Sequence, residues 1–278
     1  MTEAPVELHH VELGVSDLAR SLEFHVETLG LQPALRHAWT RDEAWLAAGP
    51  GLVRLVRVEG GDLGGWQTVN HQRGFRHVGF TVDDVDRWAD RLRRHGVEFT
   101  IAPMTALGDV RIVFFRDPDG ALVELVSGEL RYTEVWDEEL VDRHRLRTPG
   151  GAGPTLDHAA TTVSDLTAAL ATWADGLGLG RLGQVPHPDD ERGYVRSYLA
   201  AGSGVLEVFS YAVEPLDAPA DVDDHRLGLR VVGLTVADPA AAAELVVARG
   251  GRPGGPGGSV VDRDGLTVRF LPPGPPPV

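Results

Sequence analysis

The segment LHHVELGVSDLARSLEFHVETLGL at residues 8–31 recurs as LDHAATTVSDLTAALATWADGLGL at residues 156–179. The two copies share a histidine, the run VSDL and the run LGL at a constant offset of 148 positions. Between them, FRHVGFTVDDVDRWADRLRRHG at 75–96 is echoed more weakly by LRVVGLTVADPAAAAELVVARG at 229–250. Because an internal repeat constrains the architecture before any local assignment is made, the chain divides into four similar modules.

The first module predicts the order of elements within each repeat. Polar and apolar residues alternate over His10–Val15, which favours a strand with one buried face. Either Ser16 or Asp17 can cap a helix over 18–29, whose leucines and valine fall at helical spacing. Short strands near 44–49 and 52–58 complete the order β-α-β-β-β.

The second module repeats this order and sets the expected domain boundaries. Its expected strands are 76–82, 97–102, 110–116 and 121–127, and its helix is 84–95. We expect a metal-binding domain at 1–130, built from modules near 6–58 and 73–128, and a second domain at 155–271. A partly helical linker at 131–154 and a proline-rich tail at 272–278 are expected from composition.

Composition limits the chemistry that this chain can perform. The 26 basic and 41 acidic side chains of the 278 residues give a net charge of −15, which disfavours nucleic acids and anionic membranes as partners. No run of about 18 apolar residues and no signal peptide is present, so we expect a cytoplasmic protein. Every basic residue is arginine and there is no cysteine, so any metal must be bound by His, Asp or Glu.

Three motifs give the chain a family resemblance: HHVELGVSDL at 9–18, RHVGFTVDDV at 76–85 and DPDGALVEL at 117–125. They resemble the vicinal oxygen chelate superfamily, which includes glyoxalase I, extradiol dioxygenases, fosfomycin-resistance enzymes and bleomycin-binding proteins. The resemblance implies an α+β fold, with four βαβββ modules forming two cupped mixed sheets and helices outside them.

The resemblance also places a metal site in the first domain. It assigns the ligands to His10, His77 and Glu124, with Arg54 where four-ligand members carry an acid. Two histidines and one carboxylate are typical of Fe(II) oxygenases, although Mn(II) and Zn(II) accept the same ligands.

The second domain has two of the four matching positions occupied by ligand-type residues. It retains His158 and Glu207, while Val231 and Arg269 stand at the other two positions. We therefore expect this domain to be degenerate, with a structural or substrate-shaping role.

Four further residues are candidates for a role beside the metal. Arg54 could clamp an anionic substrate, or it could form a salt bridge with Glu12 across the sheet. His71 could serve as an acid or base, or it could be an exposed loop residue. Trp39 and Phe114 are expected to line the cup and to bind a planar, largely apolar substrate.

The resulting functional hypothesis is an Fe(II) dioxygenase of the extradiol type. It would bind O₂ and a small aromatic or enolisable substrate side by side on the metal. Two alternatives stay open: a Mn(II) or Zn(II) Lewis-acid transferase, lyase or isomerase, and a drug-binding resistance protein. The sequence is compatible with a monomer or a homodimer.

Overall fold

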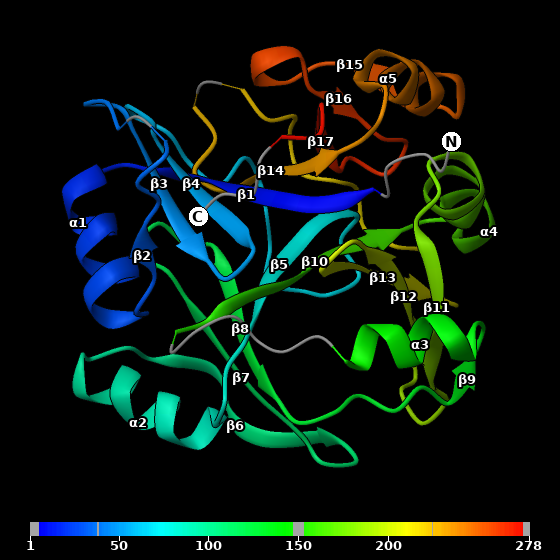
Figure 1. The fold of residues 1–278 in the computed structure, drawn as a ribbon, viewed down its shortest axis with the longest axis horizontal. Helices are drawn as coiled ribbons and strands as arrows, with labels where there is room; N and C mark the ends of the chain where they lie inside the picture. Colours follow the sequence, from blue (N-terminus) through cyan, green and yellow to red (C-terminus); the bar gives the residue numbers. More distant parts are fainter. Residues whose placement is uncertain (1–5, 38, 147–152, 224, 275–278) are drawn as a thin grey trace.

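The computed structural model describes residues 6–37, 39–146, 153–223 and 225–274. Part of the expected linker, 147–152, and the end of the expected tail, 275–278, lie outside the described residues. The described chain forms two large mixed sheets with a few helices, which confirms the α+β prediction (Figure 1). No helix among these residues has the length and apolar character needed to span a membrane.

The two sheets contain eight and nine strands. From edge to edge, the first sheet contains β15 (Arg252–Pro253), β16 (Val260–Val261), β17 (Thr267–Leu271), β14 (Gly228–Thr235), β1 (Glu7–Val15), β4 (Gly51–Arg57), β3 (Glu43–Ala48) and β2 (Gln32–Pro33). The second sheet contains β6 (Phe99–Leu107), β7 (Val110–Arg116), β8 (Leu122–Ser127), β5 (Gly74–Thr81), β10 (Thr155–Val163), β13 (Gly204–Tyr211), β12 (Tyr194–Ala201), β11 (Gly180–His187) and β9 (Glu134–Val135).

Helices connect the first and second strands of each module. They are α1 (Leu18–Leu22) continued by a π-helical turn (Glu23–Thr28), α2 (Val85–Arg94), α4 (Leu166–Leu170) continued by a second π-helical turn (Ala171–Gly176), and α5 (Pro239–Ala248); α3 (Glu138–Arg145) lies in the expected linker. Of the two N-cap candidates for the first helix, Asp17 is the cap, because its side chain accepts hydrogen bonds from the backbone N–H groups of Ala19 and Arg20.

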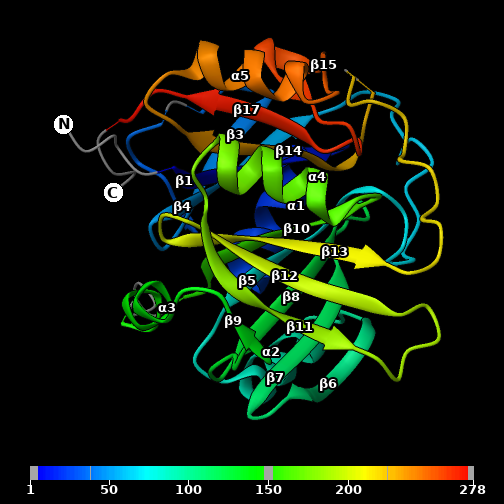
Figure 2. The same cartoon turned by 90° about the vertical axis from the view of Figure 1, so that its right-hand side faces the viewer.

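The expected domains 1–130 and 155–271 each contribute one module to each sheet. Strand β1 of the first module pairs antiparallel with β14 of the fourth, and β5 of the second module pairs antiparallel with β10 of the third. The first sheet therefore joins the two ends of the chain, while the second joins its middle (Figures 1 and 2). Adjacency in sequence did not predict which modules share a sheet.

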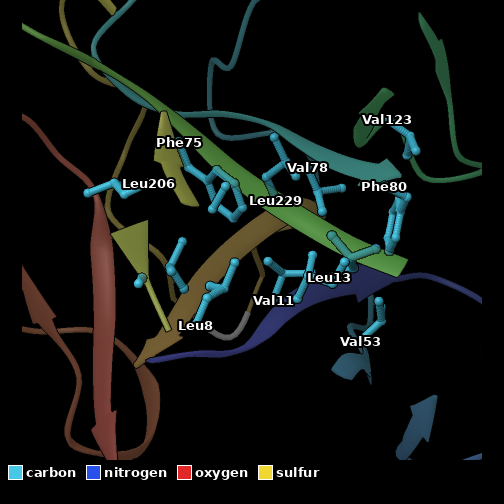
Figure 3. Packing of buried hydrophobic residues seen from close by; sticks show 14 of the residues in the cluster. Leu8, Val11, Leu13, Val53, Phe75, Val78, Phe80, Val123, Leu206 and Leu229 are labelled. Atoms are coloured by element: carbon cyan, nitrogen blue, oxygen red, sulfur yellow. The ribbon is translucent and has the colours of Figure 1, made fainter. Parts of the chain in front are cut away.

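The apolar faces of the two sheets pack against each other. Figure 3 shows Val11 and Leu13 of β1 on one side of this core and Val78 and Phe80 of β5 on the other. All four side chains are almost fully buried. The alternation predicted for His10–Val15 therefore holds, and it leaves the polar residues of each central strand on the opposite face.

Candidate metal centre

Four side chains from the middle of the chain converge on the second sheet. His77 of β5, Glu124 of β8, His158 of β10 and Glu207 of β13 each offer one ligand atom, and these atoms all lie within 4.8 Å of one another. The strand register produces this arrangement, since β5 and β10 lie side by side at the centre of the sheet. Strand β8 pairs with β5, and β13 pairs with β10.

The spacing of these ligand atoms suits a divalent cation. His77 Nε2 lies 3.0 Å from His158 Nε2 and 3.1 Å from Glu124 Oε2. Glu207 Oε2 lies 3.4 Å from His77 Nε2 and 3.6 Å from His158 Nε2. For metal–ligand bonds of about 2.1 Å, neighbouring ligands are separated by about 3.0 Å in an octahedron and about 3.4 Å in a tetrahedron. Two buried imidazole nitrogens and two carboxylates facing one point form a donor set that fits such an ion.

The orientation of His158 is fixed by its neighbours. Its Nδ1 lies 2.8 Å from Asp157 Oδ2, and Thr81 Oγ1 donates to the other oxygen of Asp157 at 2.7 Å. This carboxylate holds the ring with Nε2 directed at the other three ligands, as carboxylate partners do for metal-binding histidines. Gly79 makes room for the ring, because an added Cβ there would lie 2.0 Å from His158 Cε1.

Electrostatics in this group favour ionised carboxylates. Burial opposes the charged form of Glu124, but hydrogen bonds and charge from His158 and His77 lower its pKa to about 2. Burial likewise opposes a charged His158, yet Asp157, Glu124 and Glu207 together raise the pKa of His158 well above its usual value. A metal ion binding here must displace the proton from His158, so we expect metal affinity to increase with pH.

Two cavities flank the four ligands, and both are lined by Glu124 and Glu207. The first, of about 380 Å³, lies beside α3, and we call it the α3 cavity. The second, of about 490 Å³, is lined by Phe114 and Phe209 among others, and we call it the phenylalanine cavity. A ligand held at the four residues could therefore extend in two directions.

His10 lies on the first sheet, away from this group of four. Among the described residues, the ligand atoms that converge are those of His77, Glu124, His158 and Glu207, and His10 is not one of them. Burial, His9 and two guanidinium groups lower the pKa of His10 well below its usual value. A positively charged surrounding is unfavourable for a metal cation, which is a physical reason why His10 does not complete the expected triad.

In the first sheet, Glu12 of β1 lies at the centre of the region that corresponds to the candidate metal site of the second sheet. Its carboxylate accepts hydrogen bonds from Arg54 at 2.7 Å, Arg230 at 2.8 Å and Arg269 at 3.1 Å. One sheet thus gathers carboxylates that suit a cation, whereas the other surrounds a carboxylate with cations. The salt bridge between Arg54 and Glu12, one of the two readings open from the sequence, is present.

The other residues expected at the site lie in different places. Phe114 of β7 lines the phenylalanine cavity, with its ring edge-on to His77 at 5.1 Å between centroids. Arg54, His71 and Trp39 line neither cavity. Trp39 is 42% exposed and donates to the backbone of the strand β3, and His71 packs against Tyr211.

Sequence reasoning assigned His158 and Glu207 to a degenerate domain, yet the structure joins them to His77 and Glu124. A signal was present in the sequence. The second and third modules each carry one histidine and one glutamate at the matching positions, so pairing these two modules completes a four-residue set.

The comparisons with known proteins agree with the fold. A model of the Glyoxalase/Bleomycin resistance protein/Dioxygenase superfamily matches residues 7–125 and 155–270. A lactoylglutathione lyase of Arabidopsis thaliana is 24% identical over 226 residues, covering 79% of this chain and 69% of the relative. A lactoylglutathione lyase of Salmonella typhimurium is 28% identical over 127 residues, covering 44% of this chain and 93% of the relative. The structure of glyoxalase I from Zea mays superposes with a TM-score of 0.66 at 22% identity, covering 96% of this chain and 92% of that one.

The hypothesis of an Fe(II) dioxygenase, an oxidoreductase, is wrong. The two relatives described above are lactoylglutathione lyases, which are not oxidoreductases. The geometry supplies a physical reason, since four candidate ligands converge where three were expected, and Glu207 is the additional one. A fourth ligand fills a position that an oxygenase of the two-histidine, one-carboxylate type keeps open for O₂ or substrate.

Proposed function

Because the chain belongs to the Glyoxalase/Bleomycin resistance protein/Dioxygenase superfamily, we propose that it is a metal-dependent lyase or isomerase. Its ligands are His77, Glu124, His158 and Glu207. The observation that carries this proposal is the convergence of these four buried side chains between two cavities. The divalent metal is Zn(II), Mn(II) or another ion that accepts nitrogen and oxygen ligands.

The substrate is a small molecule with two neighbouring oxygen atoms. A divalent ion bound at this site would polarise these oxygens and make a hydrogen on the adjoining carbon more acidic. A reaction that moves this hydrogen between neighbouring carbons needs neither O₂ nor an electron carrier. The names of the relatives make lactoylglutathione the first compound to assay.

Glu207 is the residue that we assign to move the proton. Its Oε2 faces His77 and His158, while its Oε1 faces Arg196 at 3.7 Å. The hydroxyl of Tyr198 also hydrogen-bonds to this carboxylate. Glu207 lines both cavities, so a substrate extending into either one passes beside a carboxylate oxygen that can accept a proton and return it.

The test is metal titration of chelator-treated protein, with variants in both sheets. Wild type should bind one ion per chain, and His158→Ala and Glu207→Gln should each lower the affinity at least about a hundredfold. His10→Ala is the matched control, because it removes the equivalent histidine of the first sheet, and it should keep wild-type affinity. Loss of metal from His10→Ala together with retention in His158→Ala would reject the proposed site.

A second measurement tests the class of reaction. Turnover of lactoylglutathione, or of another substrate once found, should proceed at the same rate in air and under strict anaerobiosis. It should disappear on chelation and return when the metal is restored. Turnover that survives complete removal of the metal would contradict a metal-dependent lyase or isomerase.

A further inference from the structure

Arg196 of β12 lies beside the four candidate ligands. It lines both the α3 cavity and the phenylalanine cavity, and its side chain is 17% exposed. Strand β12 pairs with β13, the strand that carries Glu207. This pairing brings the guanidinium Nη1 to 3.7 Å from Glu207 Oε1.

The guanidinium of Arg196 is only partly used by the protein. Its Nε donates to His187 Nε2 at 3.0 Å, and in the part of the chain that the structure describes the carboxylate within ion-pair distance is that of Glu207. Among the described residues, Nη2 of Arg196 has no hydrogen-bond or ion-pair partner. A guanidinium has five N–H donors in a planar fork, so Arg196 retains donors for a ligand.

The other arginines of the two cavities have their own carboxylates. In the phenylalanine cavity, Arg192 is held by Asp190, with Nε–Oδ1 and Nη2–Oδ2 distances of 2.9 Å and 2.7 Å. In the α3 cavity, Arg145 Nε lies 2.8 Å from Glu129 Oε1. Only the partner of Arg196, Glu207, belongs to the candidate metal site. Arg196 is therefore the cation best placed to attract an anionic ligand to that site.

The charge balance at the site supports such a role. The two carboxylates of Glu124 and Glu207 would neutralise a divalent ion, so the ion alone would offer little net attraction to an anion. Asp157 is negative, but it is engaged by His158 and Thr81. Arg196 supplies the remaining positive charge at the junction of the cavities.

The side chains that line the phenylalanine cavity indicate the chemistry of the other end of the ligand. Phe114, Phe209 and Tyr194 line the phenylalanine cavity, together with the exposed apolar side chains of Ile101 and Met104. Such walls suit an aromatic or aliphatic group. A ligand spanning from Arg196 into this cavity would have one anionic end and one apolar end.

Resting on the proposed function, we propose that Arg196 selects a substrate with a carboxylate beside its metal-binding oxygens. The substrate class is a 2-oxo or 2-hydroxy acid that carries a further oxygen on C3 and an apolar arm. The oxygens on C2 and C3 face the metal site, the carboxylate is bound by Arg196, and the arm lies in the phenylalanine cavity. Arg196 is thus a specificity-determining residue, distinct from the four ligands.

The test uses two probes that differ in charge. Mandelate and mandelamide share a phenyl group and a 2-hydroxyl group, but only mandelate carries a carboxylate. Calorimetric titration of the zinc-loaded protein gives the preference, defined as the ratio of the mandelamide Kd to the mandelate Kd. In Arg196→Met this ratio should fall about tenfold to a hundredfold, the effect of losing a charge-assisted hydrogen bond.

The matched control is the double variant Asp190→Asn with Arg192→Met, which removes an ion pair from the same cavity without changing net charge. It should keep the wild-type ratio, and Arg196→Lys should keep most of it. Arg196→Gln replaces the methionine variant if that one does not fold. An unchanged ratio in a folded Arg196 variant that still loads zinc overturns this inference alone. Failure of wild type to load zinc overturns the proposed function first.

Discussion

At the residue scale, each sheet contains a histidine whose ring packs against a glycine of the neighbouring strand. Gly79 lies against the ring of His158 in the second sheet, and Gly233 lies against the ring of His10 in the first. In both cases an added Cβ would lie 2.0 Å from a ring atom, so each histidine needs a glycine on the neighbouring strand. The two contacts are equivalent in space, but only one of them belongs to the candidate metal site.

Gly79→Ala should therefore displace His158 and lower the affinity for zinc about tenfold to a hundredfold, as other changes that misorient a ligand do. Gly233→Ala creates the same clash on the first sheet and is the control for general damage to the fold. It should bind zinc as wild type does, although both variants should be less stable. Calorimetric zinc titration of the two variants distinguishes them. Equal loss of affinity would mean that the ring contact with Gly79 is not specific to the site.

At the element scale, the turns before β8 and β17 join each sheet to the helices of the neighbouring module. Asp119 accepts hydrogen bonds from Ser16 and Ser21, and Asp264 accepts from the backbone and side chain of Ser164. Modules that are adjacent in sequence are thus connected by turns, even though they belong to different sheets. The same turns contain Asp262, whose carboxylate accepts the backbone N–H of Leu266 at 2.8 Å.

Burial and the charge of Asp264 raise the pKa of Asp262 from 3.8 to about 7. The folded state then holds a proton that the unfolded chain releases between about pH 4 and pH 7, so this residue lowers stability as pH rises through that window. Asp262→Asn does not titrate and keeps an oxygen acceptor. It should match wild type near pH 4 and be more stable at pH 8, by up to about 4 kcal/mol.

Urea unfolding of wild type and Asp262→Asn at several pH values measures this difference. Asp262 is a better residue than Asp117 for this measurement. Burial also raises the pKa of Asp117 to about 7. Asp117 lies 3.9 Å from His25, and burial lowers the pKa of His25 to about 4, so the two titrations act in opposite directions. A free-energy difference that is the same at every pH would show that folding does not shift the pKa of Asp262.

At the scale of the whole molecule, the candidate site is divided between two halves of the chain. Residues up to Leu146 supply His77 and Glu124, and residues from Gly153 onward supply His158 and Glu207. One chain contains all four, so the site needs no second copy of the protein.

Two fragments, 1–146 and 153–278, should each bind zinc weakly when purified alone, because each retains two ligands. Co-expressed fragments that assemble should bind one ion per pair with an affinity close to that of the intact chain. Equilibrium dialysis of the fragments and of the assembled pair provides the comparison. Tight zinc binding by fragment 1–146 alone would show that the first half of the chain contains the whole site.

The sequence predicted the modules, the buried face of each central strand and two of the four clustered residues. These depend on local patterns: alternation along β1, the cap at Asp17 and the turn before Glu124. The pairing of modules depends instead on contacts between distant strands, and β1, β5, β10 and β14 have similar patterns. The family resemblance groups His10 with His77 as the first-strand histidines of two consecutive modules, although the two residues lie in different sheets.

The pairing of β1 with β14 also determines the order in which the chain can fold. Glu7 lies opposite Thr235 in this pair, whereas Gly79 lies opposite His158 in the pair of β5 with β10. Closing a longer loop costs more conformational entropy, and contacts between distant residues slow folding. We expect the second sheet to form first and the first sheet to close last, so the ligands can assemble on a folding intermediate whose two chain ends are still unpaired.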